Sequence, residues 1–156
     1  MVSKGAAARN KGKNGEREVA LQFIGAMRQV EAHLGYKYYG ENGEINQDLP
    51  SCKVERNLQQ SIAGGHDIVG IPFYAPEVKR VETPQINAWW QQCLEQANHA
   101  KLRPVLIWKM ARQDWKCRTY FKHFSGSWVV ADCNFMDWLK EFQVEYYNHL
   151  KENPLC

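Results

Sequence analysis

The amino-acid sequence predicts an α/β domain in which a mixed central β-sheet is flanked by helices. Two short extended runs lie within residues 64–82, and a near-continuous apolar strand follows at residues 103–110. Helical patterns separate and follow these runs, and strands that alternate with helices are typical of βαβ units. A chain of 156 residues is long enough to bury a core, so we expect residues 1–156 to form a single domain.

The first helix is predicted to begin near Asn14 and to end at Gly35. Glu16 lies three, four and seven residues before apolar positions of this helix, so its carboxylate is expected to face inward, where it needs a partner. Glu18 suits the solvent side of the first turn, where the helix dipole favours an acid. Residues 1–10 are small and basic and are predicted to form a flexible basic arm.

Residues 36–52 are predicted to form an inserted hairpin or loop, because Asn42-Gly43 is a strong signal for a two-residue turn. The aromatic side chains of this segment could contact DNA or pack on the domain, and the sequence favours neither. A strand is predicted at residues 52–58. The loop after it ends in two glycines, which would let Gln60 and Ser61 approach a phosphate closely.

The candidate active site combines Asp67 with Glu77-Val78-Lys79 on the next strand. Because side chains alternate along a strand, Glu77 and Lys79 point to one face and Asp67 can approach both. Two carboxylates suit Mg²⁺ or Mn²⁺, and a lysine beside them could stabilise charge on a phosphate during its transfer. The alternative is a solvated strand face that carries a surface ion pair.

A second helix is predicted to begin at Thr83-Pro84, where an N-cap residue precedes a proline, and to end near Ala100. A largely polar stripe beside its apolar face comprises Gln85, Trp89, Gln92 and Gln96. Strands are predicted at residues 115–121 and 128–133, the second at an edge of the sheet.

A last amphipathic helix is predicted over residues 134–152, with Asn134 as its N-cap. Its apolar stripe comprises Phe135, Trp138, Leu139, Phe142, Tyr146 and Leu150. We expect this stripe to be core, and a dimer interface is the alternative.

Charge is unevenly distributed, although the net charge is only +3. Residues 1–18 and 101–122 are rich in basic side chains, whereas residues 132–156 are mainly acidic. This distribution suits a polyanion bound on one face. The five cysteines are scattered without a Cys-x-x-Cys motif, which favours reduced thiols in a cytoplasmic protein and argues against a disulfide frame. No apolar run is long enough to predict a membrane span.

The motif order resembles that of the PD-(D/E)XK nuclease superfamily, and within it that of archaeal-type Holliday-junction resolvases and their phage-encoded relatives. The likeness covers roughly residues 11–122. It consists of Lys11-Gly12 with Glu16-Arg17-Glu18, then Arg56, Asp67, Glu77-Val78-Lys79, Pro104-Val105-Leu106 with Lys109, and Trp115. The departures are His66 where the signature has proline, the extra segment 36–52 and the added C-terminal segment.

This resemblance implies a restriction-endonuclease-like fold and a structure-selective DNA endonuclease that resolves four-way junctions as a homodimer. It implies Mg²⁺ as cofactor, with Mn²⁺ able to substitute. Asp67, Glu77 and the Val78 carbonyl would hold the metal, and Glu16 would hold a second ion or orient water. Lys79 would position the nucleophile. The host cell would be bacterial or archaeal, with the protein encoded there or by a phage.

The residues expected to contact DNA are basic or polar and lie near these motifs, namely Lys11, Lys13, Arg17, Arg56, Ser61, Gln92, Lys109, Lys116 and Arg118. Gln92 is included because many nucleases of this superfamily carry a glutamine on this helix that faces the site. Two other functions fit the same residues. The protein could be a different PD-(D/E)XK nuclease, such as a nickase, a repair nuclease or a restriction-type enzyme, or a non-catalytic module that binds branched DNA.

Overall fold

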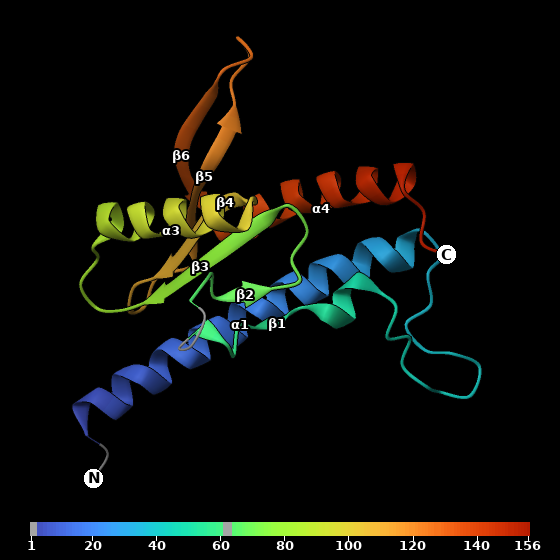
Figure 1. Ribbon diagram of the computed structural model, residues 1–156, viewed down its shortest axis with the longest axis horizontal. Coiled ribbons are helices and arrows are strands. Elements are labelled where there is room, and N and C mark those ends of the chain that lie inside the picture. The colour runs from blue at the N-terminus through green and yellow to red at the C-terminus, as the bar shows by residue number, and fades with distance from the viewer. Residues whose placement is uncertain (1–2, 61–63) are drawn as a thin grey trace.

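The computed structural model describes residues 3–60 and 64–156 and has the mixed α/β architecture expected from the sequence (Figure 1). Its elements, in chain order, are α1 (Lys4–His33), η1 (Pro50–Lys53), β1 (Glu55–Arg56), β2 (Ile68–Val69), β3 (Tyr74–Arg80), α3 (Ile86–Ala100), β4 (Arg103–Lys109), β5 (Lys116–Lys122), β6 (Trp128–Asn134) and α4 (Phe135–Glu152). None of the helices in the described residues combines the length and hydrophobicity that a bilayer span requires.

The main sheet has four strands in the order β3-β4-β5-β6. Strands β3 and β4 are parallel and are joined by α3, which makes them a βαβ unit, whereas β5 and β6 continue the sheet as an antiparallel hairpin. This hairpin projects from the body of the protein (Figure 1). Strands β1 and β2 form a separate antiparallel pair, which reaches β3 where the Asp67 amide donates to the Pro76 carbonyl (3.0 Å).

The two faces of the sheet are covered by different helices because side chains alternate along β3 and β4. On one face, Val78, Val105 and Ile107 join the core formed with α1 and α4. On the other face, Leu106 and Trp108 pack against the two buried tryptophans of α3. Glu77 and Lys79 therefore lie on the α3 face, as the alternation predicts.

Helix α1 begins ten residues earlier than expected, at Lys4 rather than near Asn14. Ser3 caps it by accepting a hydrogen bond from the Ala6 amide (3.2 Å), and the alanines that follow are strong helix formers. The prediction of a flexible arm over residues 1–10 is therefore wrong from Lys4 onward, and residues 1–2 lie outside the described part. The first turns of α1 extend beyond the rest of the protein (Figure 1).

Two further boundaries differ from the sequence prediction. The strand expected at residues 52–58 is limited to β1, because the proline-initiated turn η1 occupies residues 50–53. Gly70 (φ +87°) lets β2 approach η1 closely, since a side chain there would lie 2.3 Å from the Lys53 carbonyl oxygen. Helix α3 begins at Ile86, after Gln85, so Thr83 is not its N-cap.

The segment 36–52 folds back as expected, with an antiparallel bridge between Tyr39 and Ile45. Two of its tyrosines pack on the domain. The Tyr36 hydroxyl accepts from the Leu155 amide (2.9 Å), and the guanidinium of Arg28 lies 4.1 Å from the centre of the Tyr38 ring. The packing alternative therefore holds for these two side chains, whereas Tyr39 is exposed.

The apolar stripe of α4 is buried within the single chain, where it packs mainly against α1. Phe23 of α1 makes edge-to-face contacts with Phe135 and Phe142 (centroid distances 5.6 and 5.3 Å). The core interpretation of this stripe is confirmed, and a dimer formed through it is excluded because the stripe has no free surface.

A buried carboxylate ties three elements together behind the sheet. Glu31 of α1 is 1% exposed and accepts from the Ser51 amide (3.0 Å), the Ser51 hydroxyl (2.6 Å) and the Tyr146 hydroxyl (2.9 Å). A buried carboxylate is tolerated only when its oxygens are hydrogen-bonded, so these donors determine how η1 and α4 seat on α1.

We predict that Tyr146→Phe lowers the free energy of unfolding by roughly 1–3 kcal/mol, because it removes one donor to the buried Glu31 carboxylate and keeps the ring. Urea denaturation of both proteins measures this difference. Tyr147→Phe is the matched control, because the Tyr147 hydroxyl has no hydrogen-bond partner within residues 3–60 and 64–156. Equal stability of Tyr146→Phe and the parent would show that Glu31 does not depend on this bond.

Candidate active site

Asp67 is fixed at the open edge of β3 by hydrogen bonds of its amide and its carboxylate and is 5% exposed. Its amide donates to Pro76, and its Oδ2 accepts from the Val78 amide (2.7 Å). The Gln60 amide donates to the other carboxylate oxygen (2.5 Å). The carboxylate thus takes the place that a neighbouring strand would occupy, which holds it against residues 76–78.

Glu77 and Lys79 form a closed ring of side chains with two glutamines of α3. Lys79 Nζ lies 3.0 Å from Glu77 Oε1 and donates to Gln92 Oε1 (3.3 Å). With its amide oriented to satisfy both ends, Gln96 accepts from Gln92 (3.2 Å) and donates to Glu77 Oε2 (2.6 Å). Residues 92 and 96 are one helical turn apart, so α3 presents both amides to β3.

The ionised forms of both carboxylates are disfavoured in the folded protein. Burial and the nearby Asp67 charge, against the opposing effect of Lys79, together raise the pKa of Glu77 to about 7. Burial also raises the pKa of Asp67, although the Val78 and Gln60 hydrogen bonds oppose this. Glu16 adds to both shifts, so its carboxylate is electrostatically close to the pair. Two buried like charges with one lysine favour the binding of an additional cation.

The Val78 carbonyl lies on the same edge as these carboxylates. In an extended strand, the N–H and C=O of one residue point to the same side. Since the Val78 amide donates to Asp67, its carbonyl also points to the open edge of β3 and not toward β4. Carboxylate and carbonyl oxygens are the ligands that Mg²⁺ and Mn²⁺ prefer, so Asp67, Glu77 and Val78 fit such an ion.

Within residues 3–60 and 64–156, no three His, Cys, Asp or Glu side chains converge in a ready-made metal cluster. Glu16, the third candidate carboxylate, is held by Arg56, whose Nε donates to Glu16 Oε2 (2.8 Å). Glu18 turns to another part of the protein and accepts from Trp115 Nε1 (3.0 Å). Of the two, only Glu16 acts electrostatically on Asp67 and Glu77 among the causes of their pKa shifts, and its role in the site stays a prediction.

The residues expected to contact DNA are dispersed over several surfaces. Lys11 and Lys109 line one pocket, and Lys116 lines the neighbouring one. Lys13 and Arg17 are exposed on α1, and Ser61 lies outside the described residues. Arg56 pairs with Glu16, and Gln92 belongs to the ring on α3, as described above.

Arg118 is compensated by Asp132 on the adjacent strand. Its Nε and Nη2 donate to the two oxygens of that carboxylate (2.6 and 3.0 Å). Its Nη1 also donates to Asn87 Oδ1 of α3 (3.4 Å), so the guanidinium is engaged by partners within the protein.

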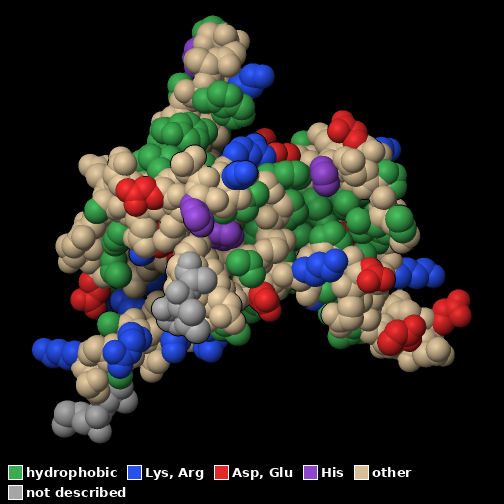
Figure 2. All heavy atoms as spheres, in the orientation of Figure 1, with side chains coloured by type: hydrophobic (Ala, Val, Ile, Leu, Met, Phe, Trp, Pro, Cys, Tyr) green, Lys and Arg blue, Asp and Glu red, His purple; other side chains and the backbone are tan. Residues whose placement is uncertain are grey.

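Basic and acidic side chains gather on different parts of the face shown in Figure 2, although the acidic group there belongs to the 36–52 segment and not to residues 132–156. Figure 2 shows basic side chains over the N-terminal part of α1, at the lower left, and acidic side chains over the 36–52 segment, at the lower right.

Two site residues were not identified as such in the sequence. Gln96 was recognised as part of a polar stripe, but only packing on β3 shows that it completes the ring with Glu77. Gln60 was expected to meet a phosphate, whereas in the structure it bonds Asp67. The four-residue spacing of Gln92 and Gln96 was the available signal for the first. No local signal exists for the second, which depends on how residues 57–67 fold back.

Comparison with known proteins identifies the family. Residues 7–148 match the family described as "Phage putative PDDEXK endonuclease", and the chain belongs to this family. It is therefore a member of the PD-(D/E)XK nuclease class, as the motif order indicated.

Among solved structures, a Holliday junction resolvase, Hjc, from Archaeoglobus fulgidus matches with 14% sequence identity and a TM-score of 0.39, covering 57% of this chain and 85% of that one. At that TM-score the likeness does not bear on substrate. No curated protein matches the chain.

The raised pKa of Glu77 predicts a pH-dependent cost to stability in metal-free buffer. Between pH 4.5 and about 7, Glu77 ionises in the unfolded chain but stays protonated in the folded one, so folding loses stability as pH rises. Glu77→Gln removes this loss, and we expect it to be more stable than the parent by roughly 1–3 kcal/mol at pH 8 and not at pH 4.

Urea denaturation in EDTA at both pH values measures the effect, with Glu95→Gln on the exposed side of α3 as control. A stability difference that does not change between pH 4 and pH 8 would contradict the assigned pKa.

Proposed function

We propose that residues 1–156 act as one nuclease domain that hydrolyses DNA phosphodiesters with Mg²⁺, or Mn²⁺ in its place, and that its substrate is the four-way junction. The observation that supports this most is the buried pair of Asp67 and Glu77 with Lys79 3.0 Å from Glu77. A purely structural ion pair has no need of a second buried carboxylate, which opposes the ionisation of the first.

Asp67, Glu77 and the Val78 carbonyl would hold the cation, which would lower the pKa of a bound water and neutralise phosphate oxygens. Lys79 would hold the attacking water and stabilise charge that develops on the phosphate. Gln92 and Gln96 keep the ammonium and the Glu77 carboxylate in position. Glu16, restrained by Arg56, would orient water or contact a second ion.

In the proposed reaction, the water oxygen bonds to phosphorus as the bond to the 3′ oxygen breaks. One water proton ends on that leaving oxygen, so the products are a 3′-hydroxyl and a 5′-phosphate. The enzyme itself is unchanged.

We also propose that the protein prefers four-way junctions and acts as a homodimer. A two-fold symmetric pair would present two such sites to two strands of a junction. Its interface would have to lie outside the buried α4 stripe. The protein would act in the cytoplasm of the bacterial or archaeal host, including during phage infection.

Cleavage of a labelled four-way junction and of a linear duplex with matched sequence tests this proposal. In Mg²⁺ we expect paired cuts confined to the junction, and no cuts in EDTA. Asp67→Asn and Lys79→Ala should each lower the rate by ~10²-fold or more, because each removes a charge that acts on the reacting phosphate. Lys140→Ala, an exposed lysine of α4, should cut at the parent rate.

Cutting of both DNAs would support nuclease activity but contradict the junction preference. Junction binding without cleavage in either metal would instead identify a non-catalytic module. Parent-like cleavage by both Asp67→Asn and Glu77→Gln would reject this site.

A further inference from the structure

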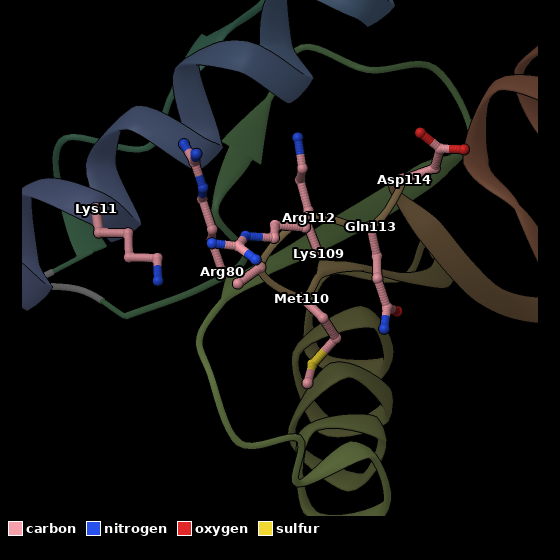
Figure 3. A pocket seen from close by; sticks show the side chains of 8 residues that line it. Lys11, Arg80, Lys109, Met110, Arg112, Gln113 and Asp114 are labelled. Carbon is pink, nitrogen blue, oxygen red and sulfur yellow. The ribbon is translucent and has the colours of Figure 1, made fainter.

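A cluster of basic side chains lies on the opposite face of β3 from Glu77 and Lys79. Lys11 of α1, Arg80 at the end of β3, Lys109 at the end of β4 and Arg112 in the following turn line a pocket of about 460 Å³ (Figure 3). We call these four residues the cation pocket. Their side chains come from three separate parts of the chain, and Arg112 extends toward Arg80 (Figure 3).

The cation pocket is adjacent to the candidate active site through the backbone of β3. Arg80 follows Lys79 directly, and successive side chains of a strand point to opposite faces. Lys79 therefore faces α3, whereas Arg80 and Lys109 lie on the side of α1. A polyanion that passes around this end of β3 could contact both sites.

The basic side chains on this side are held in place by successive contacts. Lys109 Nζ lies 5.9 Å from the centre of the Trp115 ring, and the Trp115 indole donates to Glu18 Oε1 (3.0 Å). The second oxygen of Glu18 lies 3.8 Å from Arg80 Nη1. Gly15 permits this packing, because a side chain there would lie 3.2 Å from the Arg80 Cβ and 3.3 Å from the Trp115 ring.

Arg112 adopts a backbone conformation that costs energy for a residue with a side chain. Its φ is +62°, in the left-handed region that favours glycine. Strain of this kind persists where the surrounding structure imposes it, and it occurs often at ligand sites. Here it accompanies the direction of the Arg112 side chain into the pocket (Figure 3).

The pocket holds more positive than negative charge. Glu18 forms its ion pair with Arg80, and Glu82 is 3.9 Å from Lys11 but 85% exposed. Asp114 stands at the opposite end of the pocket from Lys11 (Figure 3). Two guanidinium groups and two ammonium groups around one cavity suit an oxyanion, since arginine binds phosphate through paired donors.

We propose that the cation pocket binds a DNA phosphate other than the one cleaved, and so fixes how the strand lies across the end of β3. This inference rests on the proposed function for its ligand. Contacts to phosphate position DNA without selecting its sequence, so the pocket would act equally on all sequences. The phosphate could be internal to a strand or a terminal 5′-phosphate.

The test pairs one side chain with one phosphate. The 156-residue protein carrying Asp67→Asn, which is expected not to cleave, is titrated against fluorescent junctions with neutral methylphosphonates placed one at a time. Junctions with a 5′-phosphate or a 5′-hydroxyl form a second set. The same DNAs are then bound to proteins that also carry Arg112→Ala or, as control, Lys140→Ala.

We expect one methylphosphonate position to weaken binding roughly three- to tenfold in the Asp67→Asn background and to have little further effect once Arg112→Ala is present. Arg112→Ala should also lower the salt slope of binding by about one. The Lys140→Ala protein should respond to every methylphosphonate as the background does. If the coupling is confined to the 5′-phosphate set, the ligand is a terminal phosphate.

If Arg112→Ala and every methylphosphonate changed the binding affinity independently of each other, the cation pocket would not be a phosphate site. This failure is distinct from that of the proposed function, because cleavage by the parent protein is measured separately. Absence of DNA binding by the Asp67→Asn protein would also overturn the inference.

Discussion

The hydrogen bond from the Val78 amide to Asp67 is the interaction on which the candidate site depends. The carboxylate takes the place of a neighbouring strand at the edge of β3. The two-residue strand β2, which directly follows Asp67, is therefore long enough to hold it there. The same bond directs the Val78 carbonyl to that edge. It also places Asp67 beside Glu77, where burial and like charge raise the pKa of both side chains.

Strand alternation then assigns different chemistry to the two faces of β3. Glu77 and Lys79 meet the glutamines of α3, whereas Arg80 meets the basic N-terminal half of α1. A single short strand therefore carries a carboxylate of the proposed cation site and, three residues later, a basic side chain of the proposed phosphate site. The early start of α1 contributes to this arrangement, because Lys11 would otherwise precede the helix.

Much of this arrangement could be predicted because it depends on local rules. The alternation of Glu77 and Lys79, the inward direction of Glu16 and the amphipathic stripe of α4 each follow from residue spacing. The roles of Gln60 and Gln96 could not be predicted in the same way. They depend on how a loop folds back onto Asp67 and how α3 seats on β3, which are long-range packing effects. The start of α1 was missed because its alanines bury little, although their helix propensity is high.

Direct measurement of cation binding tests the central claim, that Asp67 and Glu77 form a divalent metal site. Electron paramagnetic resonance of free Mn²⁺, titrated with purified protein, gives the number and affinity of bound ions without requiring cleavage. The structure predicts saturable binding of at least one ion per chain, weakened at least about tenfold by Asp67→Asn and by Glu77→Gln but unchanged by Glu18→Gln. Equal binding by the parent and both site variants would contradict the claim.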